Sequence, residues 1–359
     1  MKKILILTAS YGEGHNSAAR GLQMALARIA PAVPVESHDL FAEAFGGAND
    51  WIRHAYATVI NRWPRAWGGV YRWLDRKKDF DKDFMRFSPV KKRFARLLER
   101  FQPDVVISVF PAYPYLLQQL SPNRTCQSIV VVTDSITVNA IWYRCRADYF
   151  LVPNEQSAVV VEAGGVSPAI IKAFGFPVNP KFADLAGSRE SLSAKTTPRV
   201  LYMINAGTRR APELVRRLAS LNIDLTVTVG RDEKLRRTIE AAAGTRKIQI
   251  LGWTDQLPNL LLKSHLLIGK AGGATVQESI AASCPMIINH IVSGQEEGNA
   301  QLIVETNSGA IAQSPTEVIA QVERAFSDDA RQWREWAANI AKLSRPRASL
   351  DIAEFLLAL

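Results

Sequence analysis

Short apolar runs alternate with segments of helical periodicity along most of the chain. The runs are rich in valine, isoleucine and leucine, and the segments between them repeat apolar positions at helical spacing. This alternation is typical of parallel sheets covered by helices, so the sequence predicts an α/β protein with doubly wound sheets. The expected strands are Ile4–Thr8, Val105–Phe110, Ser128–Thr133 and Tyr149–Val152 in the first half, and Val200–Ile204, Leu225–Val229, Ile248–Leu251, Leu266–Ile268 and Met286–Ile291 in the second.

The alternation stops between Phe174 and Pro198, where prolines, a glycine and serines concentrate. Such a composition is typical of a connector. A chain of 359 residues with 47% hydrophobic content is long enough for two cores of ordinary size. We therefore expect a first domain at residues 1–180, a linker at 181–198, a second domain at 199–340 and a terminal helical segment at 341–359.

The stretch 270–299 combines a glycine turn, a helix start and a cluster of polar side chains. A buried strand at His265–Gly269 precedes Gly272 and Gly273, and a helix is predicted directly behind them at Thr275–Ser283. Unpaired N–H groups and the positive end of the dipole at such a helix start favour an anion, and glycines let it approach the backbone. The pattern predicts a phosphate-binding turn.

A polar loop follows the next predicted strand. Its Gln295, Glu296 and Asn299 could hydrogen-bond sugar hydroxyls, since carboxylates accept and amides both donate and accept. Glu278 has a structural alternative, because Thr275 and Glu278 have the spacing of a capping box, in which each side chain satisfies a backbone donor of the same helix start.

The chain opens with a second turn of this kind. The strand Ile4–Thr8 leads into Tyr-Gly-Glu-Gly-His-Asn-Ser at residues 11–17, and a helix follows. His15 is therefore predicted at the carboxyl edge of the first sheet, where ligands of such sheets bind. A histidine there can accept a proton from a hydroxyl at neutral pH. The alternatives are that His15 caps its helix or contacts solvent.

The order and spacing of residues 270–299 resemble the donor signature of glycosyltransferase family 28, which includes the peptidoglycan precursor N-acetylglucosaminyltransferase and monogalactosyldiacylglycerol synthase. The resemblance implies the GT-B fold, with two Rossmann-like domains facing a central cleft and a UDP-sugar bound by the second domain. It assigns the ribose hydroxyls to Glu278, the diphosphate to Gly273–Thr275, and the hexose and adjoining groups to Gln295, Glu296 and Asn299.

Residues 8–19, Thr-Ala-Ser-Tyr-Gly-Glu-Gly-His-Asn-Ser-Ala-Ala, closely resemble the start of monogalactosyldiacylglycerol synthases and bacterial diacylglycerol glucosyltransferases. In that family the histidine matching His15 is the proposed catalytic base. Asp134 could orient or charge-stabilise a histidine or bind acceptor hydroxyls, although an aspartate at a strand end is also a common turn or cap residue. Further matches are Val131–Asp134, Trp142 and Gly175–Val178.

The sequence departs from this family at two places. Asn139 stands where the family usually has a histidine, and an amide cannot carry a proton there. The family's glycine-rich loop after the first strand of the second domain has one glycine here, in Met203–Arg209. Asn205 and Thr208 could still donate hydrogen bonds, and Arg209 or Arg210 could face the phosphates, but the backbone has less freedom than with several glycines.

Composition narrows the class of protein. No apolar run approaches the ~18 residues of a spanning helix, and the first residues enter a strand without a signal-peptide cleavage pattern. The cysteines, three in number and scattered, argue against a disulfide framework and a zinc site, which favours a reducing cytoplasm. No carboxylate-based metal motif is apparent, and a helix dipole can replace a cation, so neither a metal nor a cofactor is expected.

The positive charge is concentrated in one segment. Residues 53–100 hold fourteen lysines and arginines against five acids, a surplus of nine, which leaves one of the net +10 for the rest of the chain. Residues 51–73 also hold four of the eight tryptophans, including Trp63, Trp67 and Trp73. Tryptophan favours the membrane interface, and lysine and arginine are attracted to anionic lipid, so the segment is predicted to dock on a membrane.

Two other interpretations of this segment remain open. Trp51, Ala55, Val59 and Trp63 recur every four residues, as in a helix that covers a core. Basic and aromatic residues together also describe nucleic-acid-binding surfaces. No nucleic-acid-binding module is recognised and the rest of the chain is nearly neutral, so no nucleic-acid partner is expected.

The sequence thus predicts an inverting hexosyltransferase that transfers a hexose from a UDP-sugar to diacylglycerol or a related lipid at the cytoplasmic membrane surface. The first domain would bind acceptor and membrane, the second would bind the donor, and residues 341–359 would return to the first. The alternatives are a UDP-sugar enzyme with a polyprenyl-linked or soluble acceptor, an epimerase, and a non-catalytic binding protein. The predicted site residues are His15 and Asp134 for catalysis, Asn205, Thr208, Gly272, Gly273, Ala274, Thr275, Glu278, Gln295, Glu296 and Asn299 for the donor, and Gly14, Asn139, Trp142, Trp63, Trp67 and Trp73 for acceptor and membrane.

Overall fold

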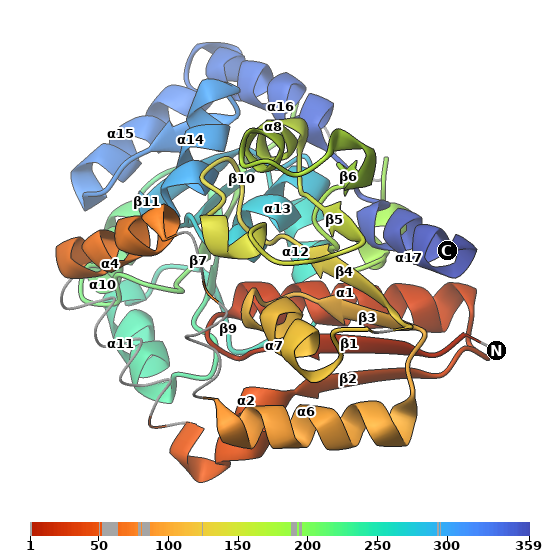
Figure 1. Ribbon diagram of the computed structural model, residues 1–359. Coiled ribbons are helices and arrows are strands. Elements are labelled where there is room, and N and C mark those ends of the chain that lie inside the picture. Colours follow the sequence, from red (N-terminus) through yellow and green to blue (C-terminus); the bar gives the residue numbers. More distant parts are fainter. Residues whose placement is uncertain are drawn as a thin grey trace. The chain divides into compact units, whose positions relative to one another are not determined.

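Two parallel sheets organise the protein, one in each of two structural units (Figure 1). The first unit comprises Met1–Pro180, Val292–Gly298 and Arg347–Leu359, and the second comprises Lys181–Ile291 and Asn299–Pro346. The computed structural model describes residues 2–49, 51, 64–77, 80, 87–123, 125–187, 192–193, 196–292, 294 and 296–359.

The sheet of the first unit has six strands in the order β2-β1-β3-β4-β5-β6. All neighbouring strands pair in parallel. Because the order runs from β1 outward in both directions, the topological switch point lies between β1 and β3, where open sheets of this kind bind ligands. The strands are β1 (Ile4–Thr8), β2 (Val35–Asp39), β3 (Val105–Ser108), β4 (Gln127–Val131), β5 (Tyr149–Leu151) and β6 (Ile171–Lys172).

Helices complete the first unit, and apolar side chains from them and from the strands form its core. The C-terminal helix α17 (Ala348–Ala358) packs beside α1 (Glu13–Ile29) (Figure 1). Lys2 Nζ donates to the carbonyls of Leu356 and Leu357, which ties the first strand to the last helix. The other helices are α2 (Leu40–Phe45), α4 (Pro64–Arg76), α6 (Ser88–Phe101), α7 (Ala112–Leu120), η1 (Ala140–Trp142), α8 (Glu155–Ala163) and η2 (Pro168–Ile170).

The second unit repeats this architecture with the strand order β12-β11-β10-β7-β8-β9, so its switch point lies between β7 and β10. The strands are β7 (Arg199–Met203), β8 (Asp224–Thr228), β9 (Gln249–Leu251), β10 (Leu266–Lys270), β11 (Met286–His290) and β12 (Gly309–Ile311). The helices are α9 (Lys181–Asp184), α10 (Ala211–Leu218), α11 (Glu233–Ala243), α12 (Leu257–Lys263), α13 (Gly273–Ala281), α14 (Glu297–Glu305), α15 (Pro315–Phe326), η3 (Asp328–Ala330) and α16 (Arg331–Leu343). The predicted α/β class with two doubly wound sheets is confirmed.

The sequence pattern missed β2, β6 and β12, which all lie at sheet edges. A central strand is buried on both faces and is therefore almost wholly apolar, whereas an edge strand is partly open to solvent. β2, with the sequence Val-Glu-Ser-His-Asp, is half-buried throughout. β6 has two residues and β12 has three, too few for a periodic pattern.

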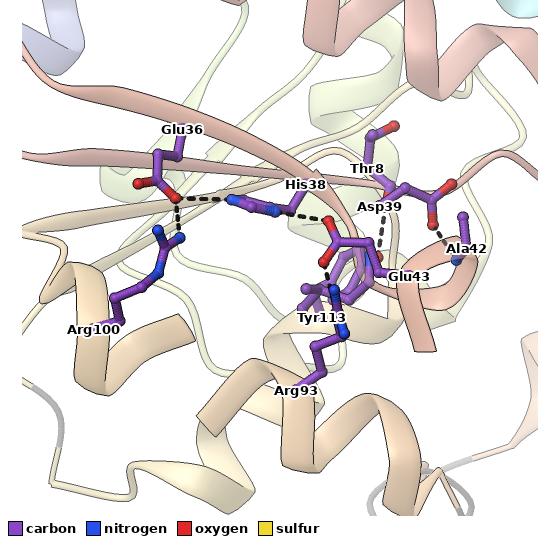
Figure 2. A network of polar contacts seen from close by, with 10 residues as sticks. Thr8, Glu36, His38, Asp39, Ala42, Glu43, Arg93, Arg100 and Tyr113 are labelled. Atoms are coloured by element: carbon purple, nitrogen blue, oxygen red, sulfur yellow. Dashed lines mark hydrogen bonds and ion pairs between the residues drawn. The ribbon is translucent and has the colours of Figure 1, made fainter. Parts of the chain in front are cut away.

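Charged side chains hold the polar edge strand β2 to its covering helices (Figure 2). The ring of His38 bridges two carboxylates, with Nδ1 2.7 Å from Glu43 Oε1 and Nε2 2.8 Å from Glu36 Oε2. Arg93 donates to Glu43, and Arg100 donates to Glu36. Burial raises the pKa of Glu36, but the hydrogen bonds from His38 and Arg100 outweigh it and lower that pKa below its usual value. The network joins β2 to α2 and α6.

Replacement of Gly21 by alanine is expected to destabilise the protein by about 1–3 kcal/mol, because a core position without free space cannot accept a methyl group without a backbone shift. A Cβ atom at Gly21, in α1, would lie 2.0 Å from the Pro177 carbonyl oxygen. Gly69, in α4, has no atom of the described residues within 4 Å of the corresponding position, so Gly69→Ala is the matched control. Denaturant unfolding measures both variants, and equal stability of the two would contradict this packing.

Candidate active site

Buried polar contacts fix the turn that follows β1. Asp39, at the end of β2, accepts from the Ser10 amide at 2.8 Å and also caps α2 by accepting from the Ala42 amide. Tyr113 donates to the Thr8 carbonyl at 2.6 Å and accepts from the Leu40 amide (Figure 2). These contacts hold the loop between β1 and α1 to the end of β2 and to α7.

His15 lies three residues into α1, beside the switch point of the first sheet. Its Nδ1 donates to the carbonyl of Val109, the residue directly after β3, at 2.7 Å. A carbonyl can only accept, so the proton of the neutral ring is on Nδ1 and the lone pair is on Nε2. Thr133 Oγ1, from the loop after β4, lies 3.2 Å from the same Nδ1. The arrangement leaves Nε2 as the basic atom.

Aromatic rings surround the imidazole of His15. Phe110 meets it edge to face at a centroid distance of 5.2 Å, and Trp142 lies at 5.9 Å with a tilt of 43°. Burial lowers the pKa of His15 from 6.5 to about 4, and the hydrogen bond to Val109 offsets part of that effect. His15 is therefore a neutral base at physiological pH.

The interpretation of His15 as a helix cap is wrong. The N-cap of α1 is Gly12, and no side chain caps this helix start. Asp134 is half-buried, and its Oδ2 accepts from the indole nitrogen of Trp142 at 2.8 Å. The backbone of Val109 sets the tautomer of His15, and Asp134 fixes the ring that packs against it. Gly14 is the second residue of α1.

The glycine turn of the second unit opens a helix two residues earlier than predicted. α13 begins at Gly273 and ends at Ala281, whereas the expected helix was Thr275–Ser283. Its N-cap is Gly272, and no side chain caps this helix start. The first amides of the helix, at Gly273, Ala274 and Thr275, are therefore not satisfied by a capping side chain. Thr275 is inside the helix, and the capping-box interpretation of Glu278 is therefore wrong. Glu278 is half-buried.

Asn205 brings the ends of β7 and β10 together at the second switch point. It lies two residues after β7, and its Nδ2 is 3.4 Å from Thr275 Oγ1 in α13. The loop then turns at Gly207, whose φ of +67° favours glycine. Thr208 is exposed in this turn, and Arg210 donates to the Gln313 carbonyl at 3.0 Å.

Asn299 presents a buried acceptor beside the glycine turn. Its Nδ2 donates to the carbonyl of Ala271, which directly precedes Gly272, at 3.0 Å. Its Oδ1 is buried and has no hydrogen-bond partner among the residues that the structure describes. A buried acceptor of this kind costs free energy unless a ligand or water donates to it. Glu296 is also buried, and its Oε2 accepts from the Val292 amide within its own loop at 2.9 Å. Gln295 lies outside the described residues.

The residues predicted for acceptor and membrane fall into different environments. Asn139 is buried and caps η1 by accepting from the Ile141 amide at 3.1 Å. Trp142 is 2% exposed, so it lines His15 and is no membrane contact. Trp73 is 59% exposed on α4. Trp63 and the side chain of Trp67 lie outside the described part of the structure.

Trp51 is 75% exposed, so this residue covers no core, contrary to what the core-covering interpretation expected of it. Ala55 and Val59, which shared this pattern, lie outside the described residues.

Two features, one beside His15 and one after the edge strand β9 of the second sheet, were not predicted from the sequence. The Val109 carbonyl has no sequence signal, because every residue carries one. Trp253, two residues after β9, is 64% exposed, and the Arg231 guanidinium lies 5.1 Å from its ring centroid. A tryptophan directly after Gly252 at a strand end was a visible signal, since aromatic rings at such edges can bind ligands.

Among the described residues, no group of three or more histidine, cysteine, aspartate or glutamate side chains is arranged to hold a metal ion. No helix in the described segments is long and apolar enough to span a membrane. Whether a metal or cofactor takes part stays a prediction from the sequence.

The half-buried His15, whose ring is neutral in the folded protein, is expected to make folding depend on pH. Its pKa is about 4 in the folded protein, whereas an imidazole in the unfolded chain has the usual value of 6.5. The unfolded chain therefore takes up the proton first as the pH falls. The free energy of unfolding then decreases between pH 6.5 and 4, by an amount on the order of 3 kcal/mol. Denaturant unfolding across this range should show a steeper decrease for the parent than for His15→Gln. Parallel curves would contradict a buried neutral ring.

Comparison with known proteins places this geometry in a family. Residues 15–178 match the sequence model of monogalactosyldiacylglycerol (MGDG) synthase, and residues 204–349 match that of the glycosyltransferase family 28 C-terminal domain. A probable monogalactosyldiacylglycerol synthase 2 of rice (Oryza sativa subsp. japonica) is 26% identical over 98% of this chain and 80% of its own. The monogalactosyldiacylglycerol synthase of spinach (Spinacia oleracea) is 26% identical over 99% of this chain and 72% of its own.

Solved structures share the fold at low sequence identity. MurG of Acinetobacter baumannii superposes with a TM-score of 0.62 and 12% identity over the whole of both chains. The UDP complex of MnaA from S. aureus has a TM-score of 0.66 and 14% identity, and the match covers 100% of this chain and 98% of that one. These likenesses support the GT-B fold. The two family models, which between them match residues 15–178 and 204–349, and the relatives along nearly the full chain identify the protein as a glycosyltransferase of family 28 that is similar to the monogalactosyldiacylglycerol synthases.

Proposed function

We propose that this glycosyltransferase transfers a hexose from a UDP-sugar to the free hydroxyl of diacylglycerol, or of a related lipid, with inversion at the anomeric carbon. The observation that carries the proposal is the neutral His15, whose Nδ1 donates to Val109 and whose Nε2 holds the lone pair. The rice and spinach relatives are named as synthases of a galactosyl diacylglycerol, which supports diacylglycerol as the proposed acceptor.

The reaction proceeds by a single displacement. His15 Nε2 accepts the proton of the acceptor hydroxyl while that oxygen bonds to the anomeric carbon. The bond from this carbon to the diphosphate oxygen breaks, and UDP leaves with the electron pair. Attack from the face opposite the leaving group inverts the configuration. A ring with a low pKa is unprotonated at neutral pH, so the base is ready before the acceptor binds.

The uncapped start of α13 suits the leaving group. Negative charge grows on the diphosphate as the bond breaks, and fixed N–H groups with a helix dipole stabilise it most in the transition state. Asn299 offers its unpartnered Oδ1 to a sugar hydroxyl beside this turn. We assign Glu278 to the ribose, and Gln295 and Glu296 to the hexose, on the family resemblance. The exposed ring of Trp253 offers a stacking surface for the base.

Helix α4 is the surface that we propose for docking on the cytoplasmic face of the membrane. Trp73 and Val70 are exposed on it, and Lys77 Nζ lies 5.1 Å from the Trp73 ring centroid. The segment that contains α4 carries nearly all the surplus positive charge of the chain. Exposed indole rings with adjacent cations fit the interface of an anionic bilayer, where each cation adds about 1 kcal/mol of attraction.

Replacement of His15 by alanine is expected to lower glycolipid formation by about 10²–10⁴-fold, because the general base is removed. The assay incubates the protein with diacylglycerol vesicles and radiolabelled UDP-glucose or UDP-galactose and extracts the lipid product. UDP binding, measured by calorimetry, should be unchanged. His38→Gln is the matched control, since His38 lies on β2 and is engaged by the carboxylates of Glu36 and Glu43. Full activity of His15→Ala would overturn the proposal, and label in a soluble product would indicate another acceptor or an epimerase.

Replacement of Trp73 by alanine is expected to weaken binding to anionic vesicles about tenfold or more, because the indole ring anchors α4 at the interface. Sedimentation with phosphatidylglycerol vesicles measures this binding. Trp253→Ala removes another exposed tryptophan and should leave vesicle binding unchanged while it weakens UDP binding. Equal vesicle binding by Trp73→Ala and the parent would exclude α4 as the docking surface.

A further inference from the structure

Two side chains join α4 to the short helix η1. Asp75, near the end of α4, accepts with Oδ1 from the Ala140 amide at 2.9 Å. Arg144, which follows η1, donates with Nη1 to the Asp75 carbonyl at 3.1 Å and also to the Lys77 carbonyl. One contact thus reaches from α4 to the start of η1, and the other returns from beyond η1 to the end of α4. We call Asp75 and Arg144 the clasp.

A chain of contacts connects helix η1 to His15. The start of the helix is capped by Asn139, and Tyr115 donates to the Ile141 carbonyl at 2.9 Å. Its last residue, Trp142, is held by Asp134 and packs against the imidazole of His15 at 5.9 Å. Any displacement of η1 therefore moves the aromatic wall of the base.

The clasp and the docking surface occupy the same end of α4. Trp73, which is exposed, stands two residues before Asp75, and Leu74 between them packs on the core of the first unit. Both clasp residues are exposed, although the bond from the buried Ala140 amide to Asp75 is itself partly buried. Water therefore competes for the Asp75 carboxylate and the Arg144 guanidinium, and their hydrogen bonds strengthen where a lipid interface excludes water and lowers the dielectric constant.

We propose that Asp75 and Arg144 are positioning residues of the transfer reaction, which close on η1 when α4 docks on lipid and thereby set Trp142 against His15. The proposal rests on the proposed function. It makes a lipid surface an activator of the base in addition to the source of the acceptor. In water the clasp opens and closes, and docking shifts this equilibrium toward the closed form, because the closed form gains more free energy at the interface.

The test compares rates on two forms of acceptor. One is dioleoylglycerol in saturating phosphatidylglycerol and phosphatidylcholine vesicles, and the other is monomeric dioctanoylglycerol. Asp75→Ala is expected to lose about fivefold or more of the rate on vesicles, the equivalent of one hydrogen bond of ordinary net strength, and to keep the monomer rate within about twofold. Asp75→Asn should retain the vesicle rate, because the amide oxygen still accepts from Ala140.

Arg144→Ala should behave as Asp75→Ala does. Arg146→Ala is the matched control, since Arg146 is exposed on the same segment and donates to the Pro122 carbonyl at 3.5 Å, away from α4. An equal loss of rate on vesicle and monomer acceptors would mean that the clasp has only a structural role, and it would overturn the proposal. An unchanged vesicle rate in Asp75→Ala and Arg144→Ala would also overturn the proposal.

Hydrogen–deuterium exchange separates this proposal from the proposed function, because it needs no turnover. Vesicles should slow amide exchange over residues 139–144 of the parent and leave it unchanged in Asp75→Ala. If vesicles slow this exchange but the protein forms no glycolipid, the coupling between α4 and η1 is supported and the assigned reaction is overturned. Unchanged exchange in the parent would overturn the coupling.

Discussion

The hydrogen bond from His15 Nδ1 to the Val109 carbonyl is the interaction on which this account depends. It exists because β1 and β3 are parallel neighbours, so that the helix after one and the loop after the other begin at the same sheet edge. The bond places the ring proton on Nδ1, so that the lone pair of the neutral ring is on Nε2. A backbone carbonyl brings no charge that would favour the imidazolium, and burial therefore keeps the ring neutral.

Each unit has a switch point in its sheet, and the two switch points carry groups of different chemistry. At the switch point between β1 and β3 the first unit places a neutral base walled by aromatic rings. At the switch point between β7 and β10 the second unit places an uncapped helix start, which favours an anion. A glycosyl transfer needs both functions, since one group must take a proton from the acceptor and another must stabilise the charge on the departing diphosphate.

The sequence predicted those parts of the fold that apolar burial specifies. Central strands such as β1 and β10 are buried on both faces, and their apolar runs marked them clearly. The edge strand β2 was missed, because polar contacts around His38 replace the apolar contacts of a central strand (Figure 2). The helix start at Gly273 was placed two residues too late, because glycine has low helix propensity and was taken as turn.

Side-chain roles were harder to predict than side-chain identities. The motif around His15 indicated a base, but its partner is a main-chain carbonyl ninety-four residues away and leaves no mark on the sequence. Asn139 and Trp142 were assigned to acceptor or membrane, and the structure adds that both are buried, Asn139 as a helix cap and Trp142 against the ring of His15. Periodicity cannot distinguish these roles, because a buried polar cap depends on tertiary contacts.

The most direct test of the account is the protonation state of His15, measured by long-range ¹H–¹⁵N correlation spectra of the labelled protein, with His15→Gln for assignment. The account predicts a neutral ring at pH 7 with the proton on Nδ1 and a pKa near 4. A proton on Nε2, or an imidazolium at pH 7, would contradict it, because neither form has a lone pair on the nitrogen that must accept the acceptor's proton.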